Sequence, residues 1–343
     1  MKQQSIFDYI NVDGFSSTPK YLQLANSIQE AVYAGKIHKD RILPSLHELT
    51  YHLEISKDTA DRGYKYLRKL GILSSIPGKG HYITATDVVR PYKIFLLINQ
   101  LSTNKKLFYD TFTQALGENV TIDFYVYNND FGLFKELLTT RRDGYTHYVI
   151  LPHFTEGGEA ANRLINTIPK DKLILIDKNI KGVESGYGGV FENFRKDIYN
   201  ALELALPKLS KYDTIKLVYG QGSYFPAEIA DGFHLFCQQY AFERSIIKST
   251  NNEEITKGQV FICLEENDLI RLIERVSKLN LKVGKDVGII SYNETPLKKY
   301  ILDGITTIST DFEQMGQKAA EMILGDNMSH IELDCRLKLR SSL

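Results

Sequence analysis

The stretch Leu43-Pro44-Ser45-Leu46-His47-Glu48-Leu49, continued by Glu54-Ile55-Ser56-Lys57, decides the fold of the first part of the chain. Ser45 and Glu48 stand three residues apart, which is the spacing of a capping box at the start of a helix. Ser56 is a second residue of the type that accepts a hydrogen bond from a free N–H at a helix start. The sequence therefore predicts two helices, separated by a turn so short that it fixes them at an angle.

The residues on either side of this stretch extend the same pattern. Residues 21–32 carry apolar side chains at helical spacing, with Pro19 before them and Gly35 after them, where a helix begins and ends. Residues 72–76 and 81–83 predict two short strands around a turn that contains Gly78 and Gly80. Three helices and a hairpin make a winged helix-turn-helix, so we expect an α+β domain over residues 1–85.

The charge of this segment differs from that of the whole chain. The 343 residues carry 42 Lys and Arg against 42 Asp and Glu, and this balance excludes a histone-like protein that coats nucleic acid. Residues 57–79 alone carry six basic and two acidic side chains, a local charge of +4. In this fold the third helix lies in the major groove of DNA, where cations contact phosphates. A solvated helix face is the alternative, but it explains neither the short turn nor the wing.

Four segments resemble the GntR family of bacterial regulators: residues 19–24, 43–49, 55–67 and 78–83. The resemblance implies DNA binding, with His47 where the family usually has an Arg that contacts DNA and with Asp61 where Arg or Gln is frequent. Side chains at the start of the third helix are expected to contact the edges of the bases. Asp58 either accepts from a cytosine amino group or stabilises the first helical turn. The residues expected at the DNA are Ser45, His47, Ser56, Lys57, Asp58, Thr59, Arg62, Lys65, Lys79, Gly80 and His81.

A change of pattern near residues 84–91 predicts a domain boundary, with a linker at 86–92 and a second domain over 93–343. There, apolar runs alternate with helical runs, which is typical of parallel sheets covered by helices on both faces. The expected strands are 93–98, 120–127, 147–151, 173–177, 215–219, 245–248, 259–263 and 287–292. The expected helices are 108–116, 131–140, 160–168, 194–206, 227–240, 268–279 and 312–324.

Polar side chains follow several of these strands, and ligands of such sheets bind at the carboxyl ends of the strands. Amides, carboxylates and aromatic rings suit a hydroxyl-rich ligand, because they donate and accept in fixed directions and cover C–H faces. The alternative is that these residues only make turns. The residues expected to bind a small-molecule effector are Asn99, Gln100, Asp177, Tyr224, Asn267, Asn293 and Glu294.

A second resemblance covers the chain from about Tyr92 to the end. Residues 284–294, 305–308, 315–320, 175–178 and 337–342 look like the effector domain of LacI-type repressors. This implies two doubly wound lobes of the periplasmic-binding-protein type with a ligand between them. Asn293 stands where the family usually has a hydroxyl-binding Asp, Asn267 matches a pocket Asn, and Asp177 matches a pocket-rim Asp. The usual pocket Arg is Ile229 here, which favours a neutral sugar, although Arg195 is an alternative cation.

The pairing of the two domains resembles the architecture of the arabinose-responsive repressor. It implies a homodimeric, sugar-responsive repressor that binds a pseudo-palindromic double-stranded operator. A pentose or a deoxyhexose, such as arabinose or fucose, is the expected effector. A phosphorylated sugar as effector, an activator with the same parts, and a sugar receptor with no role at DNA remain as alternatives.

Other classes of protein are disfavoured. The sequence contains neither a Gly-x-Ser-x-Gly nucleophile elbow nor a His-Glu-x-x-His helix. The stretch Gly220-Gln221-Gly222-Ser223 lacks the third glycine of a dinucleotide-binding fingerprint. We therefore expect that the protein is not an enzyme and holds no cofactor. No apolar run is long enough for a signal peptide or a membrane span, so a cytoplasmic protein is expected.

The three cysteines are expected to be buried thiols, with no metal site. His147 and His153 are expected at the surface or in packing.

Overall fold

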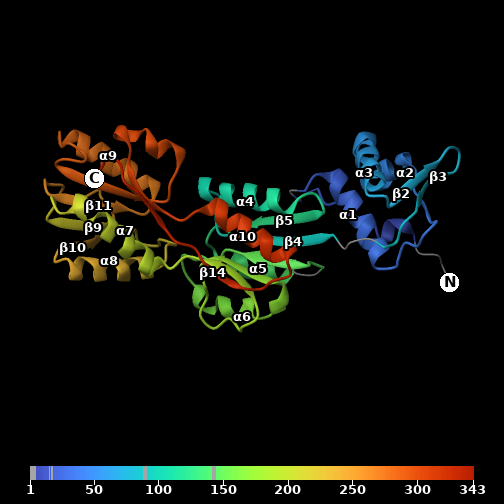
Figure 1. The fold of residues 1–343 in the computed structure, drawn as a ribbon, viewed down its shortest axis with the longest axis horizontal. Helices are drawn as coiled ribbons and strands as arrows, with labels where there is room; N and C mark the ends of the chain where they lie inside the picture. The colour runs from blue at the N-terminus through green and yellow to red at the C-terminus, as the bar shows by residue number, and fades with distance from the viewer. Residues whose placement is uncertain (1–4, 15, 17, 88–90, 141–143) are drawn as a thin grey trace. The chain divides into compact units, whose positions relative to one another are not determined.

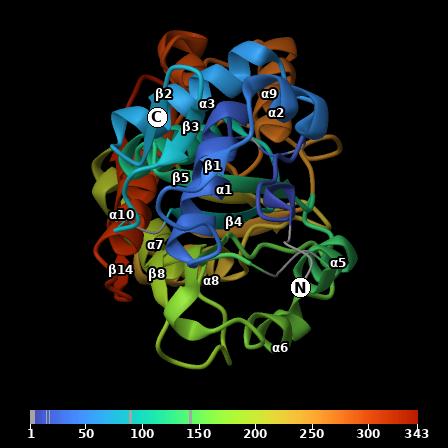
Figure 2. The same cartoon turned by 90° about the vertical axis from the view of Figure 1, so that its right-hand side faces the viewer.

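The structure is a computed structural model that describes residues 5–14, 16, 18–87, 91–140 and 144–343. The N-terminal elements are a 3-10 helix η1 (Ile6–Asp8), three α-helices and three short strands, grouped in Figures 1 and 2. The strands form one antiparallel sheet in the order β1-β3-β2. The elements are α1 (Lys20–Tyr33), β1 (Ile42–Leu43), α2 (Leu46–Leu53), α3 (Lys57–Lys69), β2 (Leu73–Ile76) and β3 (Gly80–Ile83).

The start of α2 and the start of α3 are capped as the sequence predicts. The Glu48 N–H donates to Ser45 Oγ over 3.2 Å, and the Ser45 N–H donates to Glu48 Oε2 over 2.7 Å. At α3 the Thr59 N–H donates to Ser56 Oγ over 3.1 Å. Between the helices Glu54 takes a left-handed conformation with φ of 50°, which reverses the chain direction within the two-residue turn.

Packing between α1 and α3 forms the centre of this small core. Leu24, Ala60, Tyr64 and Leu67 are all fully buried. Gly63 permits the close approach of the two helices, since a Cβ at this position would lie 2.9 Å from Leu24 Cδ2. The hydroxyl of Tyr64 donates to the Pro44 carbonyl over 2.7 Å, which ties α3 to the residue before the α2 cap.

The remaining elements build two lobes, each on one six-stranded sheet. In the first lobe the strand order is β14-β8-β7-β6-β4-β5, and in the second it is β10-β9-β11-β12-β13-β15, with β15 antiparallel to β13. The first-lobe strands are β4 (Tyr92–Ile98), β5 (Val120–Val126), β6 (His147–Ile150), β7 (Leu173–Asp177), β8 (Gly188–Phe191) and β14 (His330–Glu332). The second-lobe strands are β9 (Thr214–Val218), β10 (Glu243–Ile247), β11 (Gln259–Cys263), β12 (Val287–Tyr292), β13 (Thr306–Ser309) and β15 (Arg336–Lys338).

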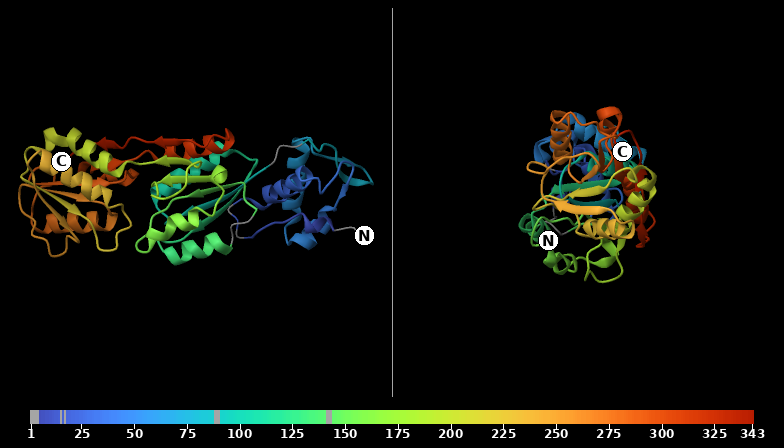
Figure 3. Two further views of the ribbon diagram at one scale, coloured as in Figure 1. Left: turned by 90° about the horizontal axis from the view of Figure 1, so that it is seen from below. Right: turned by 90° about the vertical axis from the view of Figure 1, so that its left-hand side faces the viewer.

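Helices lie on both faces of each sheet, as Figure 3 shows. The α-helices are α4 (Thr103–Leu116), α5 (Phe131–Thr140), α6 (Ala161–Ile165), α7 (Phe194–Leu209), α8 (Glu228–Gln239), α9 (Glu266–Lys278) and α10 (Phe312–Leu324). Short 3-10 helices are η2 (Gly158–Ala160), η3 (Lys170–Lys172), η4 (Pro296–Lys299) and η5 (Ile301–Asp303).

Strand β11 shows why its sequence is continuously apolar. Val260 and Ile262 pack into the cluster that contains α7 and α8, whereas Phe261 and Cys263 pack into the cluster that contains α9. Successive side chains of a strand point to opposite faces, so a sheet with helices on both faces buries every residue of a central strand.

The chain passes between the lobes three times. It leaves the first lobe after β8, returns from β13 to α10, and leaves again between β14 and β15. Helix α10 belongs to the first lobe although it follows nearly all of the second in sequence, and it packs against β7 and β8. The two-lobed fold confirms the expected fold class.

Some elements differ from the sequence-based expectation. Strands β1, β8, β13, β14 and β15 were not predicted as strands, and α4 begins at Thr103 rather than at residue 108. Helix α6 is only five residues long. Two of the three cysteines are buried as expected, but Cys335 is only partly buried.

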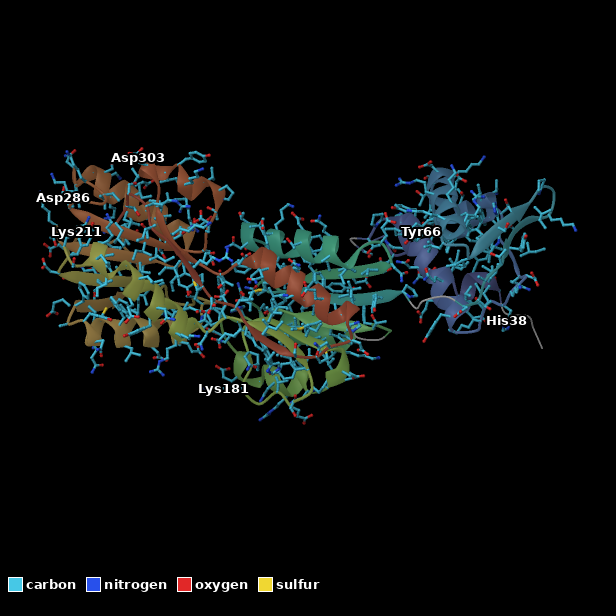
Figure 4. The ribbon with its side chains drawn as sticks, in the orientation of Figure 1. His38, Tyr66, Lys181, Lys211, Asp286 and Asp303 are labelled. Atoms are coloured by element: carbon cyan, nitrogen blue, oxygen red, sulfur yellow. The ribbon has the colours of Figure 1, made fainter. Side chains whose placement is uncertain are left out.

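A turn before β12 explains part of the LacI-like motif. Gly284 has φ of +81°, and a Cβ there would lie 1.9 Å from the Ser341 carbonyl oxygen, so only glycine fits without a backbone shift. The Lys211 ammonium donates to the Gly284 carbonyl over 2.6 Å, and the Lys282 N–H donates to Asp286 Oδ2 over 2.9 Å. Figure 4 labels Lys211 and Asp286 in the second lobe.

Candidate functional site

Two cavities lie at the carboxyl ends of the strands. The inner cavity has a volume of about 30 Å³ and the outer cavity about 390 Å³, and Asn104, Tyr224 and Tyr292 line both. The other residues of the inner cavity are Ser102, Lys105, His153, Asp177, Glu192, Phe194, Phe225, Asn293 and Phe312. The other residues of the outer cavity are Gln100, Leu101, Ser102, Thr103, Phe225, Leu264, Glu265, Glu266, Asn267, Asn293, Thr295 and Lys298.

Five of the seven residues expected to bind the effector line these two cavities. Asp177, Tyr224 and Asn293 line the inner cavity, whereas Gln100, Tyr224, Asn267 and Asn293 line the outer one. They stand at or after the ends of β4 and β7 in one sheet and of β9, β11 and β12 in the other, and within each sheet the carboxyl ends of parallel strands lie at the same edge.

The other two lie elsewhere. Asn99 is fully buried, and its amide donates to Asn129 Oδ1 over 2.8 Å, so it fastens the end of β4 to the loop after β5. Glu294 lines a separate cavity of about 490 Å³ and accepts a hydrogen bond from Arg340 Nη2 over 3.0 Å. The Arg340 and Thr307 contacts hold the pKa of Glu294 below its usual value although burial opposes them.

An ionic cluster that the sequence analysis did not predict forms one wall of the inner cavity. Asp177 accepts hydrogen bonds from the Lys105 ammonium and, over 3.0 Å, from His153 Nε2. Burial acts to raise the pKa of Asp177, but Lys105 and His153 outweigh it and hold the pKa below its usual value. Asp177 is therefore ionised and its charge is balanced by Lys105.

Two further titratable groups belong to this cluster. Burial raises the pKa of Glu192 well above its usual value, and the neighbouring Asp177 carboxylate adds to the effect. Burial lowers the pKa of His153 despite the opposing effect of Asp177. His153 was expected as a surface or packing residue; its ring is 3% exposed, meets Phe194 and Tyr224 edge-on and is also hydrogen-bonded to Asp177.

Aromatic rings from the second lobe form the opposite wall. The rings of Tyr224 and Phe225 are stacked with centroids 4.5 Å apart, and Phe225 meets Tyr292 edge-on at 5.9 Å. Tyr224 also meets the His153 ring edge-on at 6.0 Å. Flat apolar surfaces opposite a polar wall suit a ligand with C–H faces and a hydroxyl rim.

A buried lysine holds the loop that carries Asn293. Lys298 is 2% exposed, and its ammonium donates to the Tyr292 carbonyl over 2.9 Å and to the Asn293 carbonyl over 2.6 Å. Asn293 itself has φ of 64°, in the left-handed region that favours Asn among non-glycine residues. The lysine thus satisfies two carbonyls where the chain turns sharply after β12.

The position expected for a pocket arginine is part of the core. Ile229 on α8 is fully buried in the cluster with Ile198 and Phe233, and it contributes nothing to either cavity. Arg195, the alternative cation, is exposed and does not line them either. Among the described residues, no arginine lines the inner or the outer cavity.

The residues expected at the DNA form an exposed surface on α2, α3 and the β2–β3 turn. His47, Lys57, Asp58, Arg62, Lys65, Lys79 and Gly80 are exposed, as are the cap residues Ser45 and Ser56, whereas Thr59 and His81 are partly exposed. Not all of these side chains are free. Lys65 pairs with Asp61 at 2.6 Å, and the Arg62 guanidinium lies 4.3 Å from the centre of the Tyr21 ring on α1.

Two properties concern metals and membranes. Over the described ranges, no group of three or more His, Cys, Asp or Glu side chains is arranged to hold a metal ion. In the same part of the chain, none of the helices has the length and apolar character that a membrane crossing requires.

The comparisons with known proteins agree with this architecture. A family model described as a periplasmic binding protein-like domain matches residues 218–343. A LacI family transcriptional regulator from Lactobacillus casei with bound glucose covers 73% of this chain and 99% of its own, with a TM-score of 0.58 and 12% identity. At this identity the likeness shows the fold.

Two curated proteins of Bacillus subtilis (strain 168) are similar to shorter parts of the chain. The transcriptional repressor YtrA, described as HTH-type, is 33% identical over 75 residues, which are 22% of this chain and 58% of that protein. The HTH-type transcriptional regulator KdgR is 29% identical over 103 residues, which are 28% of this chain and 30% of that protein. The chain thus spans little more than half of one relative and less than a third of the other.

Proposed function

We propose that this protein is a sugar-responsive transcriptional regulator that binds double-stranded operator DNA through a GntR-like winged helix-turn-helix, and that it is no enzyme. The observation that carries the proposal is the presence, in one chain, of a capped and exposed basic helix α3 and of a two-lobed fold with polar cavities at its strand ends. Domain bounds of 1–85 and 93–343, with a linker at 86–92, belong to the same proposal.

The exposed cations support the DNA half of the proposal. Lys57 and Lys79 are exposed at the start of α3 and in the turn between β2 and β3, the two places where a winged helix-turn-helix meets DNA. The relatives named above are themselves helix-turn-helix regulators of transcription.

The cavities support the sugar half. Their walls combine carboxylates, amides and aromatic rings. Among the described residues, the Lys and Arg side chains that line them are Lys105 and Lys298, and both are buried and already paired. A neutral monosaccharide, such as a pentose or a deoxyhexose, fits these walls better than a phosphorylated sugar. We further propose a cytoplasmic homodimer that acts as a repressor and is released from DNA when the sugar binds.

A gel-shift titration with the DNA upstream of the protein's own gene tests the first half. Because cations on phosphates release counterions, affinity is expected to fall by about a thousandfold or more between ~50 and ~200 mM salt. Lys57→Ala is expected to weaken binding and to reduce the salt slope by about one. Lys208→Ala removes an exposed charge on α7 and serves as the control. Affinity that does not depend on salt would exclude the phosphate-contact model.

Addition of neutral monosaccharides to the preformed DNA complex tests the second half. A regulator of this kind loses DNA affinity by a factor of about 5–150, which is the range of ordinary allosteric coupling. A sugar that tightens the complex would indicate co-repression or activation instead. Sugar binding without any specific DNA binding would favour a receptor.

A further inference from the structure

Two of the residues that line the inner cavity carry a buried polar atom without a hydrogen-bond partner among the described residues. Tyr292 is 2% exposed, and its hydroxyl has no partner among the described residues. His153 is 3% exposed, and its Nδ1 is also without a partner there. Buried polar groups are nearly always paired, and an unpaired one costs about 1–3 kcal/mol. Two such groups in the wall of one cavity indicate that something else satisfies them.

The chemistry of the two groups indicates what that partner offers. Since His153 Nε2 donates to the ionised Asp177, the neutral ring leaves Nδ1 as a hydrogen-bond acceptor. Burial raises the pKa of Tyr292 well above its usual value, so its hydroxyl stays protonated and donates or accepts. An acceptor and a hydroxyl carried by two residues that line one cavity suit a ligand that itself carries O–H groups.

The charges around the cavity oppose an anion. Asp177 is ionised, and its charge adds to burial in raising the pKa of Glu192 beside it, since a second negative charge there is unfavourable. A phosphate or carboxylate would bring such a charge, and its oxygens are acceptors that cannot donate to His153 Nδ1. Of the Lys and Arg side chains in the described part of the chain, Lys105 alone lines the inner cavity, and it is already paired with Asp177.

We propose that Tyr292 and His153 are effector contacts, and that the inner cavity binds an uncharged, hydroxyl-bearing part of the ligand while it rejects anionic sugars. This inference rests on the proposed function, since it identifies the residues and the ligand class of the same cleft. It adds two specificity-determining residues to those that the sequence analysis expected to bind the effector.

The substitution Tyr292→Phe tests the first part. An unpaired hydroxyl contributes nothing to the empty protein, so its removal should leave the midpoint of urea unfolding unchanged or raised. The same change should weaken effector binding about three- to tenfold, which corresponds to one lost hydrogen bond. Tyr212→Phe is a matched control, because Tyr212 is 3% exposed with an unpartnered hydroxyl but lines neither cavity. Unchanged affinity in Tyr292→Phe would overturn the assignment.

Calorimetric titration of the full chain with L-arabinose, L-fucose and D-glucose, and then with D-glucuronate and glucose 6-phosphate, tests the second part. At least one neutral sugar is expected to bind about tenfold or more tightly than the two anions, because like charges in a desolvated site repel. Tighter binding of an anion would overturn the inference but leave a sugar-responsive regulator intact. No binding of any of these sugars, neutral or anionic, would count against the proposed function itself.

Discussion

Asp197 shows how a single buried carboxyl responds to pH. It lies at the start of α7, where the chain enters the second lobe, and it accepts a hydrogen bond from the Asn193 N–H over 2.9 Å. Burial raises the pKa of this group from 3.8 to about 6. The folded protein therefore holds a proton on Asp197 that the unfolded chain has already released between these two pH values.

The sign of the effect on stability follows from this difference. The stabilisation from the protonated carboxyl is complete below about pH 4 and is lost as pH rises through about 6. Asp197→Asn keeps a neutral acceptor, so it is expected to raise the free energy of unfolding at about pH 8 and to have little effect at about pH 4. Urea unfolding at both pH values measures this. Asp334→Asn, which removes an exposed carboxylate, is the control, and equal effects of Asp197→Asn at both pH values would contradict the assignment.

Helix packing in the second lobe depends on one glycine. A Cβ at Gly232 on α8 would lie 2.1 Å from the Arg195 carbonyl oxygen and 2.6 Å from Ile198 Cγ2, both on α7. The contact to a backbone oxygen cannot be relieved by a side-chain rotation. Packing between α7 and α8 thus explains why glycine stands at position 232.

Gly232→Ala is therefore expected to destabilise the protein by about 1–3 kcal/mol, although alanine is the better helix former by about 1 kcal/mol. Thermal or urea unfolding measures the change. Leu235→Ala on the same helix removes a side chain that is 42% exposed and should change stability far less. If Gly232→Ala were stabilising, the close approach of α7 and α8 would be wrong.

The elements that could be predicted are those whose signals are local. Ser45, Glu48 and Ser56 could be recognised from the sequence as the caps of α2 and α3, because a helix cap depends only on residues within the first turn of its own helix. Strand β8 was missed because it begins with Gly188 and Gly189, which weaken any strand pattern, and its pairing with β7 and β14 comes from distant segments.

The residues of the candidate site also divide into those with a local sequence signal and those that only the tertiary structure brings together. Asp177, Tyr224 and Asn293 could be predicted because each stands at or after the carboxyl end of a strand in one of the two sheets. Lys105 and His153 could not, since they come from a helix and a loop, and only the tertiary structure brings both to Asp177. Whether a strand-end residue lines a cavity is also non-local, as Asn99 and Glu294 show by their contacts to Asn129 and Arg340.

At the scale of the whole molecule, the proposed two-fold operator requires two copies of the chain. Light scattering at micromolar concentration is expected to give a mass twice that of one chain, because a dimer places two copies of α3 on successive half-sites. A single-chain mass for the DNA-bound protein would contradict the dimer. At a concentration one hundred times its Kd, the effector should add about 2.7 kcal/mol to the free energy of unfolding of the dimer.

The order of the segments has a consequence for synthesis in the cell. The first lobe has its strands β4 to β8 early in the chain, but α10, which packs on β7 and β8, emerges from the ribosome only after roughly 120 further residues, on the order of ten seconds later. During that interval an apolar surface that Phe312, Met315 and Ala319 later cover stays open. Newly made chains are thus expected to need chaperone protection until α10 has docked.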